Sequence, residues 1–572
     1  MHLTRIKTAL VSLGNSYTIG GAICLLAIVF ALQQARVWQG DVLNPGGLSL
    51  LGQFFSASLH PDLSREFLQL TGKETITTLA YAVCGSFLSV IIGLVGGIFA
   101  SEVWWLALLR HQKRPFWLTI RAFLAIPRAV HEMLWGLLFV NIWGLDPLTA
   151  ILAIAIPFGA VTTKVFSEIL DETPRQPLLT LLNSGVSPVK AFLYTLLPQA
   201  WLNLLSYSFY RFECSLRSAA VLGIVGAGGL GYQIYLSLQS LRYEQLWTLF
   251  YALFILNGAV DLSSAWLRHR LGCANRLDLN LRRLVKKQGS REQGAEGVKK
   301  QGAGEEVSDY FWYQRDFLVD GSGLAILMLI PCCFWYIQPD FSQLWSLKTW
   351  SMVGDLVRID LPNHLDFNQL QELAYLSSQT LAMAILAIVI AGLGGILLSF
   401  PAAHNFGSSR FSFSPSVIIT RAFLLICRAI PAPIWALVAL FILFPGVLPG
   451  AIALAIHNLG ILGRLMAEVV ENIETPPLEA LQAQGTPDNL IFLYGVLPLT
   501  LPRFITYILY RWEVCLRETV IVGLVGAGGL GRNLKEQLSS FDSQGILLTL
   551  ACLILLTFWV DWVSGIARRS LK

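Results

Sequence analysis

Two groups of charged residues interrupt stretches of the chain that are otherwise apolar. Both groups have the order arginine, glutamate, arginine, and they consist of Arg211, Glu213 and Arg217 and of Arg511, Glu513 and Arg517. A guanidinium group can donate two parallel hydrogen bonds to an oxyanion, so these arginines can relay an anion. The alternative is a structural Glu–Arg lock between helices. Both interpretations are open, because each glutamate can neutralise one arginine and leave the other for an anion.

The composition places these charges inside a lipid bilayer. Hydrophobic residues make up 55% of the 572 residues and charged residues only 13%, which is not the composition of a soluble protein. Disordered proteins, disulfide-stapled secreted domains and nucleic-acid-binding proteins all need more polar surface, so these classes are excluded. The nine cysteines show neither zinc-ligand nor redox spacing, so no metal site is expected.

Twelve apolar stretches are predicted to cross the hydrocarbon core, which takes about 20 helical residues. They cover residues 8–35, 75–101, 121–143, 147–170, 201–227 and 245–260 in the first half and residues 321–338, 373–400, 416–443, 448–470, 501–527 and 545–560 in the second half. Arg211 lies about 15 Å into the fifth stretch at 1.5 Å per residue, near the middle of the membrane. A charge there costs at least about 2.5 kcal/mol unless it faces water or a partner. The expected fold is an all-α, polytopic membrane protein.

Basic residues predict the orientation, since Lys and Arg are retained on the cytoplasmic side. They follow the second, sixth and twelfth stretches and also precede the first. Both termini are therefore expected in the cytoplasm, with residues 39–69 and 339–371 outside. The polar, basic segment at residues 271–320 is a predicted cytoplasmic linker.

The chain repeats itself at an offset of 300 residues. The arginine groups recur at this spacing, and the sequence VGAGGLG at 225–231 returns unchanged at 525–531. We therefore predict two domains, a first repeat at 1–270 and a second repeat at 321–572. With six spans in each, both repeats insert the same way round, and such a parallel repeat encloses a central pathway.

The glycines of the repeated sequence satisfy the spacing GxGxxG. They are Gly226, Gly228, Gly229 and Gly231 in the first repeat and Gly526, Gly528, Gly529 and Gly531 in the second repeat. A dinucleotide site is rejected, because it requires a preceding strand and a βαβ unit, whereas these glycines follow a membrane helix. Close helix packing by small residues and a flexible outer gate are the two interpretations, and packing is preferred.

Prolines beside Arg128 and Arg428 predict a kink in the third span of each repeat. These prolines are Pro127, Pro431 and Pro433. His131, Glu132 and His457 have no equivalents in the other repeat and are interpreted as local hydrogen-bonding residues. Two pairs four residues apart, Lys164 with Glu168 and Arg464 with Glu468, lie near the cytoplasmic end of the fourth span and are interpreted as structural or as support for the docking loop.

A cytoplasmic loop of the second repeat, at about 471–498, has the spacing of a known motif. Glu479 and Ala480 are followed by Gly485 and then by Pro498. This arrangement resembles the EAA loop of bacterial ABC importer permeases, which implies a short helix that seats in a cleft of the cytoplasmic ATPase subunit. Glycine permits the sharp turn that the loop needs.

The equivalent loop of the first repeat, at about 171–198, departs from the family pattern. Gly185 and Pro198 keep their places, but Leu179 stands where the family has glutamate. The departure puts an equal contribution of the two loops to ATPase docking in question.

The wider sequence resembles the phosphonate transport permeases, a family that also handles phosphite and phosphate. The resemblance rests on residues 510–517 and 522–531 and on their first-repeat equivalents. It implies an ATP-driven importer in the bacterial cytoplasmic membrane, with two cytoplasmic ABC ATPase subunits and an external solute-binding protein as partners. No nucleic acid partner is implied.

Energy must come from the partners. The chain has no GxxxxGK[ST] sequence, the loop that cradles ATP phosphates, so no catalytic residue and no cofactor is expected on it. An ion-coupled secondary transporter with 6+6 helices remains an alternative, as does an ABC permease for another ligand, such as an amino acid or a quaternary amine. A membrane enzyme is disfavoured, because no nucleophile or metal-ligand cluster is found at one interface.

Overall fold

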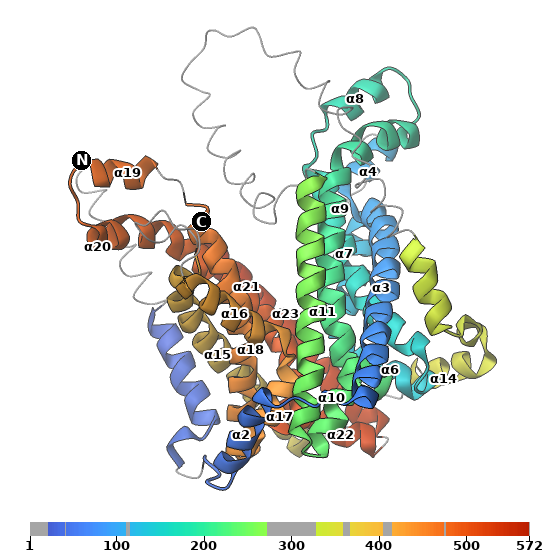
Figure 1. Cartoon of the computed structure of the whole chain (residues 1–572). Coiled ribbons are helices and arrows are strands. Elements are labelled where there is room, and N and C mark those ends of the chain that lie inside the picture. Colours follow the sequence, from blue (N-terminus) through green and yellow to red (C-terminus); the bar gives the residue numbers. More distant parts are fainter. Residues whose placement is uncertain are drawn as a thin grey trace. The chain divides into compact units, whose positions relative to one another are not determined.

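The structure is a computed structural model in which helices form every regular element of the described residues (Figure 1). The described residues are 21–39, 42–109, 115–271, 328–357, 367–403, 415–473, 476–540 and 542–570. A single antiparallel bridge joins Leu43 to Leu443. The predicted linker, apart from its first residue, lies outside the described residues.

The first repeat contains nine labelled α-helices from α3 onward. They are α3 (Arg65–Ala100), α4 (Glu102–Leu109), α5 (Pro115–Ala129), α6 (Glu132–Trp143), α7 (Pro147–Glu172), α8 (Gln176–Asn183), α9 (Pro188–Leu222), α10 (Gly229–Gln239) and α11 (Tyr243–Arg270). A shorter helix, α2 (Gly47–Ser56), precedes them.

The second repeat follows the same plan from α15 onward. Its helices are α15 (Phe367–Ala402), α16 (Pro415–Ala429), α17 (Ala432–Ile442), α18 (Val447–Glu471), α19 (Pro476–Ala483), α20 (Asp488–Ile491), α21 (Leu497–Val522), α22 (Gly529–Ser539) and α23 (Ser543–Ser570). The short helix α14 (Leu347–Val357) precedes them, as α2 does in the first repeat.

Seven helices of the described residues are long and apolar enough to cross a membrane, and two bent helix pairs raise the number to nine. Two shorter apolar helices, Gly21–Gln34 and Met328–Ile337, lie in the first and seventh predicted spans, whose other residues are partly outside the described ranges. Helix α9 covers most of the fifth predicted span and carries the first arginine group. The all-α membrane fold predicted from the sequence is confirmed.

Two compact units make up the described residues. The first-repeat unit comprises residues within 63–240 and 251–350, and the second-repeat unit comprises residues within 1–62, 241–250 and 351–572. The opening segment of each repeat thus belongs to the unit of the other repeat. Ala31 packs in a core cluster with Met383 and Leu454 of the second repeat, and the Trp143 indole donates to Thr349 Oγ1 at 2.9 Å in the first-repeat unit.

Small residues bring the central helices of each unit together. In the first-repeat unit, a Cβ on Gly93 of α3 would lie 2.3 Å from Thr162 Cγ2 of α7, and one on Gly97 would lie 2.7 Å from Phe166 Cβ. Such distances are possible only for glycine, so α3 and α7 approach as closely as small-residue interfaces in membranes do. Helices α3 and α7, joined in this way, both pack against α9.

The third span of each repeat is broken. Helices α5 and α6 meet at 80°, and α16 and α17 meet at 94°, which is a far larger change of direction than the predicted kinks. Pro431 is the N-cap residue of α17. Helix α16 ends at Ala429, because proline disfavours a helical conformation in the residue before it. In the first repeat Pro127 lies inside α5, and the break falls after Ala129, where the His131 side chain accepts from the Met133 N–H.

Candidate functional site

Glu213 joins the fifth helix of the first repeat to the last helix. Its Oε1 accepts hydrogen bonds from Ser264 Oγ at 2.7 Å and from the Arg268 guanidinium at 2.9 Å. The Glu213 side chain is only 6% exposed, so the ion pair and the hydroxyl satisfy a buried carboxylate. Glu213 is therefore part of a lock between α9 and α11.

The second repeat contains the same interaction 300 residues later. Glu513 accepts from the Arg568 guanidinium, and Arg568 also donates to Ser564 Oγ at 2.9 Å. Ser564 in turn donates to the Leu509 carbonyl at 3.1 Å. The lock between α21 and α23 thus uses the same three residue types as the lock between α9 and α11.

A Glu–Arg lock was one of the two predicted interpretations, but the sequence pattern did not identify Arg268 and Arg568 as its basic partners. The available signal was their recurrence at the repeat offset together with Ser264 and Ser564, four residues before each arginine. Arg217 and Arg517 instead make a local bond, donating from Nε to the backbone carbonyls of Glu213 at 3.4 Å and Glu513 at 3.3 Å.

Arg511 is held by two side chains in the second repeat. Its guanidinium donates to Asn458 Oδ1 at 2.8 Å and to Glu518 Oε1 at 3.0 Å. Asn458 Nδ2 donates to Glu518 Oε2 at 3.1 Å, which closes a triangle between α18 and α21. Asn458 is fully buried, and the charge of Arg511 is neutralised within the triangle.

Arg211 occupies the same position in the first repeat but has different neighbours. Its guanidinium carbon lies 4.1 Å from the centroid of the Phe158 ring and 5.9 Å from that of Tyr207. Phe158 replaces Asn458, and Ser218 replaces Glu518. Arg211 is only 7% exposed, so the aromatic faces provide it with a cation–π environment.

A carboxylate reaches the fifth helix from another element in the first repeat. Ser218 donates to Glu132 Oε1 at 2.7 Å, and Glu132 Oε2 lies 3.2 Å from His131 Nδ1. Both residues lie at the break between α5 and α6. Their interpretation as local hydrogen-bonding residues fits these contacts, which tie the broken span to α9.

The two predicted docking loops contain short helices, α8 and α19, that end at the turns of Gly185 and Gly485. Gly185 and Gly485 have φ of +84° and +75°, in the left-handed region that glycine occupies without strain. After α8 the Val186 N–H bonds to the Leu181 carbonyl at 3.1 Å, and after α19 the Thr486 N–H bonds to the Leu481 carbonyl at 3.3 Å. Both ends are Schellman caps, so the two loops have the same turn.

The predicted docking residues are exposed in both repeats, and the loop prolines lie within the helices that follow. Glu479 and Ala480 are exposed on α19, and Leu179 is 53% exposed on α8. Pro498 follows a π-helical turn, Phe492–Val496, inside a helical stretch that runs from Asn489 to Ala527. Pro198 likewise lies inside α9, which begins at Pro188.

The glycine turns pack closely within each repeat. Gly226, Gly228 and Gly229, and their second-repeat equivalents Gly526, Gly528 and Gly529, all have positive φ. A Cβ on Gly231 would lie 1.8 Å from the Ala220 carbonyl oxygen, and one on Gly531 would lie 2.2 Å from that of Val520. The geometry agrees with close packing, and a gating role stays a prediction.

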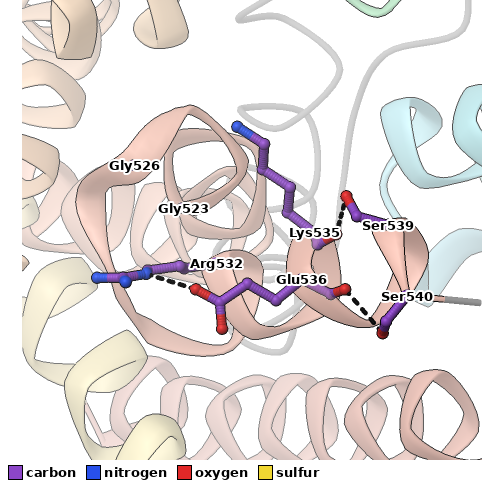
Figure 2. A pocket seen from close by; sticks show the side chains of 7 residues that line it. All are labelled: Gly523, Gly526, Arg532, Lys535, Glu536, Ser539 and Ser540. Atoms are coloured by element: carbon purple, nitrogen blue, oxygen red, sulfur yellow. Dashed lines mark hydrogen bonds and ion pairs between the residues drawn. The ribbon is translucent and has the colours of Figure 1, made fainter. Parts of the chain in front are cut away.

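A basic pocket adjoins the glycine turn of the second repeat. Figure 2 shows the side chains that line this pocket of about 450 Å³, which are Gly523, Gly526, Arg532, Lys535, Glu536, Ser539 and Ser540. Arg532 Nε donates to Glu536 Oε1 at 2.9 Å. The first repeat has Tyr232 and Tyr235 where the second has Arg532 and Lys535, so the basic lining is specific to the second repeat.

Curated relatives of the chain are named as permeases for phosphorus oxyanions. The phosphate-import permease protein PhnE of Mycolicibacterium smegmatis is 28% identical over 460 residues, which cover 79% of this chain and 77% of the relative. The phosphite transport system permease protein PtxC of Stutzerimonas stutzeri is 32% identical over 34% of this chain and 69% of its own length. A putative cryptic phosphonate transport system permease protein, PhnE2 of Escherichia coli, is 39% identical over 21% of this chain and 97% of its own length.

The family model described as "Binding-protein-dependent transport system inner membrane component" matches the chain twice, at residues 93–272 and 395–572. Each match contains one arginine group, one docking loop and one glycine turn. The internal duplication predicted from the sequence is therefore a duplication of this family domain. The chain belongs to the family of binding-protein-dependent transport system inner membrane components, with one family domain in each repeat.

Proposed function

We propose that the chain is the transmembrane permease subunit of an ATP-driven ABC importer for a phosphonate or a related phosphorus oxyanion, phosphite or phosphate. The observation that carries the proposal is the doubled family domain, together with relatives named for phosphate and phosphite transport. One chain then supplies both permease domains. An external solute-binding protein delivers the ligand.

Two cytoplasmic ABC ATPase subunits are the proposed motors. Helices α8 and α19 are short and largely exposed, as helices that dock onto a partner subunit would be. Glu479 adds a negative charge to α19. ATP binds to these partners, so the permease itself needs no cofactor. Their side of the membrane is the cytoplasm, and the basic residues near both ends of the chain support a cytoplasmic position of the termini.

The docking loops are connected directly to the arginine-bearing helices. Helix α9 is continuous from Pro188 to Leu222, so Arg211 lies 23 residues, or about 35 Å, along the same helix from the loop. In the second repeat α21 leads from Pro498 to Arg511. Closure of the ATPase subunits can therefore reorient the arginines by moving α9 and α21 as levers.

The arginine groups provide the proposed chemistry of translocation. Glu213 and Glu513 act as locks, which neutralise the charges of Arg268 and Arg568. Arg211, Arg217, Arg511 and Arg517 are the candidate pathway cations. A guanidinium binds two oxygens of a phosphoryl or phosphonyl group at once, so a relay of such groups lowers the cost of moving an anion across the hydrocarbon core.

A transport assay with a controlled energy source tests this function. Proteoliposomes containing the permease, its ATPase and its binding protein should accumulate labelled methylphosphonate, phosphite or phosphate only with ATP. Glu479→Arg combined with a proline in each of α8 and α19 should stop uptake. Uptake driven by a proton gradient without ATP, or normal uptake by the docking variant, would favour the secondary transporter. Uptake of an amino acid or quaternary amine instead would change the substrate and keep the ABC mechanism.

A further inference from the structure

One segment of the first-repeat unit buries a polar side chain and exposes its apolar ones. It comprises residues 341–350, a 3₁₀ turn followed by the first turn of α14. Trp345, Leu347 and Trp350 are 80%, 90% and 59% exposed. Thr349, which lies between the last two, is only 7% exposed. A helix surrounded by water shows the opposite arrangement, and a continuous exposed apolar surface marks an interaction site.

Hydrogen bonds on the polar side fix the segment to the turn between α6 and α7. The Trp143 indole donates to Thr349 Oγ1 at 2.9 Å, and the Gln343 amide donates to Asp146 Oδ2 at 3.3 Å. The other carboxylate oxygen of Asp146 accepts from the Leu148 N–H at 2.7 Å and caps α7. These bonds determine which side of the segment is exposed.

An aromatic contact joins the segment to the apolar helix that precedes it. The Phe341 ring lies 6.2 Å from that of Phe334 on the helix Met328–Ile337. Phe334 in turn lies 6.2 Å from Phe87 of α3. The exposed apolar surface therefore continues directly from a helix of the seventh predicted span.

Two predicted span ends give the depth of the segment. The seventh span ends at residue 338 and the fourth begins at residue 147. The bond between Gln343 and Asp146 joins the chain just beyond these two ends. Tryptophan is enriched at this level of a membrane, because its ring is apolar and its indole N–H is polar. The segment thus has the composition and the position of the boundary between acyl chains and headgroups.

The second-repeat unit has a similar arrangement after the first predicted span. Leu48 on α2 and Leu59 in the turn after it are 63% and 79% exposed. The chain before α2 is bonded to the end of α17, where the Asn44 N–H donates to the Ile442 carbonyl at 2.6 Å. Each unit therefore attaches an exposed apolar segment to the last residues of its broken third span.

We propose that residues 341–350 are an interfacial anchor. Trp345, Leu347 and Trp350 insert into the headgroup region of the lipid bilayer, and the bonds of Gln343 and Thr349 hold the α6–α7 turn at that depth. The partner of this surface is lipid and not protein, because the surface continues from a membrane span. The inference goes beyond the proposed transport function, and its test needs no transport.

Photochemical cross-linking from position 347 identifies the partner. The permease with benzoylphenylalanine in place of Leu347 would be irradiated in vesicles of phosphatidylcholine and phosphatidylglycerol, and its adducts would be identified by mass spectrometry. Lipid adducts should be at least about fivefold more abundant than with the same residue in place of Glu479, which is exposed on α19. Yields within about twofold of each other, or adducts mainly with a second copy of the chain, would overturn the proposal.

The same variant in whole cells tests for a protein partner. Lipid adducts should again prevail, and a prevailing adduct with another protein would contradict a lipid anchor. Trp345 is 80% exposed and provides a second position for the photoreactive residue, with the same expected results, if the Leu347 variant does not reach the membrane.

A depth measurement separates an interfacial anchor from contact with the hydrocarbon core. A fluorescent amino acid at position 347 would be quenched by lipids with bromine near the headgroup end or near the methyl end of the acyl chains. Quenching from the headgroup end should be at least about threefold stronger. Equal quenching, or stronger quenching from the methyl end, would overturn the proposal.

The hydrogen bonds of the segment are tested in the same vesicles. Gln343→Ala combined with Thr349→Val should reduce the ratio of the two quenching values at least about twofold, because the segment loses the contacts that fix its depth. A ratio equal to that of the protein with both residues intact would show that the α6–α7 turn is not held by the segment.

Discussion

The two repeats fix their fifth and last helices by the same ion pair, but they surround the central arginine of the fifth helix with different residues. Glu213 and Arg268 correspond to Glu513 and Arg568, whereas Phe158 corresponds to Asn458. Both repeats are built for the same bilayer. Interactions present in both repeats are therefore those that the fold requires, and positions that differ are free to take on separate tasks.

The docking loops and the glycine turns show the same combination of shared backbone geometry and divergent side chains. The Schellman turns at Gly185 and Gly485 agree, but the docking helices expose Leu179 in one repeat and Glu479 in the other. The glycine turns also have positive φ at equivalent positions, but the helix that follows carries Tyr232 and Tyr235 in the first repeat and Arg532 and Lys535 in the second. The comparison predicts that equivalent substitutions at a shared interaction have the same effect in either repeat. Equivalent substitutions at a divergent position should have unequal effects.

The largest effect is expected at the shared ion pairs. Glu213→Gln and Glu513→Gln should each destabilise the folded protein by about 3 kcal/mol, because removing one partner leaves a largely buried arginine charge uncompensated. Thermal or denaturant unfolding in detergent measures the change. The paired variants E213Q/R268Q and E513Q/R568Q should recover most of the loss. A large difference between the two repeats would contradict their structural equivalence.

Steric insertion at the glycine turns should have a somewhat smaller and again symmetrical effect. Gly231→Ala and Gly531→Ala place a Cβ against the carbonyl oxygens of Ala220 and Val520. Such overpacking costs about 1–3 kcal/mol, measurable as a lower unfolding midpoint. Gly258→Ala is a matched control, since a Cβ there meets nothing within 4 Å. Destabilisation by the control equal to that of Gly231→Ala would remove the packing explanation.

The docking helices should respond unequally. Glu479→Lys reverses a charge that the resemblance to the EAA loop assigns to ATPase binding, and ATP-dependent uptake should fall about tenfold, which corresponds to about 1.4 kcal/mol of coupling. Leu179→Lys should reduce uptake less than threefold. ATP hydrolysis by the assembled complex and co-purification of the ATPase are the measurements. Equal losses in the two variants would show that the loops contribute alike despite Leu179.

The smallest effect is expected at the basic pocket of Figure 2. Arg532→Gln with Lys535→Gln should lower the uptake rate at low substrate concentration two- to threefold, because exposed positive charge increases the arrival rate of an anion. The effect should disappear in high salt, where such fields are screened. The same substitutions at Tyr232 and Tyr235 should leave the salt dependence unchanged. A loss that persists in high salt would point to a structural cause.

Much of the architecture could be predicted from the sequence because its signals are local or repeated. Apolar stretches, the 300-residue offset and the docking glycines are visible in the residues themselves. The partners of Glu213 could not be identified in this way, because Ser264 and Arg268 lie 51 and 55 positions away and meet it only when α9 and α11 pack.

Other features depend on packing between helices, which a comparison of the two repeats in sequence cannot show. The opening segments exchange between the two compact units, although the sequence repeat assigns each to its own half. Likewise, the break between α5 and α6 brings Glu132 to Ser218, 86 residues further along the chain. The carboxylates of Glu132 in the first repeat and Glu518 in the second therefore cannot be compared until the helices are placed.

The most direct test of the account is ATP-driven uptake by the reconstituted permease with its ATPase and binding protein. Labelled methylphosphonate, phosphite and phosphate would be compared with methionine and glycine betaine in the same proteoliposomes. The account predicts that at least one of the three phosphorus oxyanions accumulates with ATP and that neither of the other ligands does. Failure of all three phosphorus compounds, with ATP-dependent accumulation of methionine or glycine betaine, would contradict it.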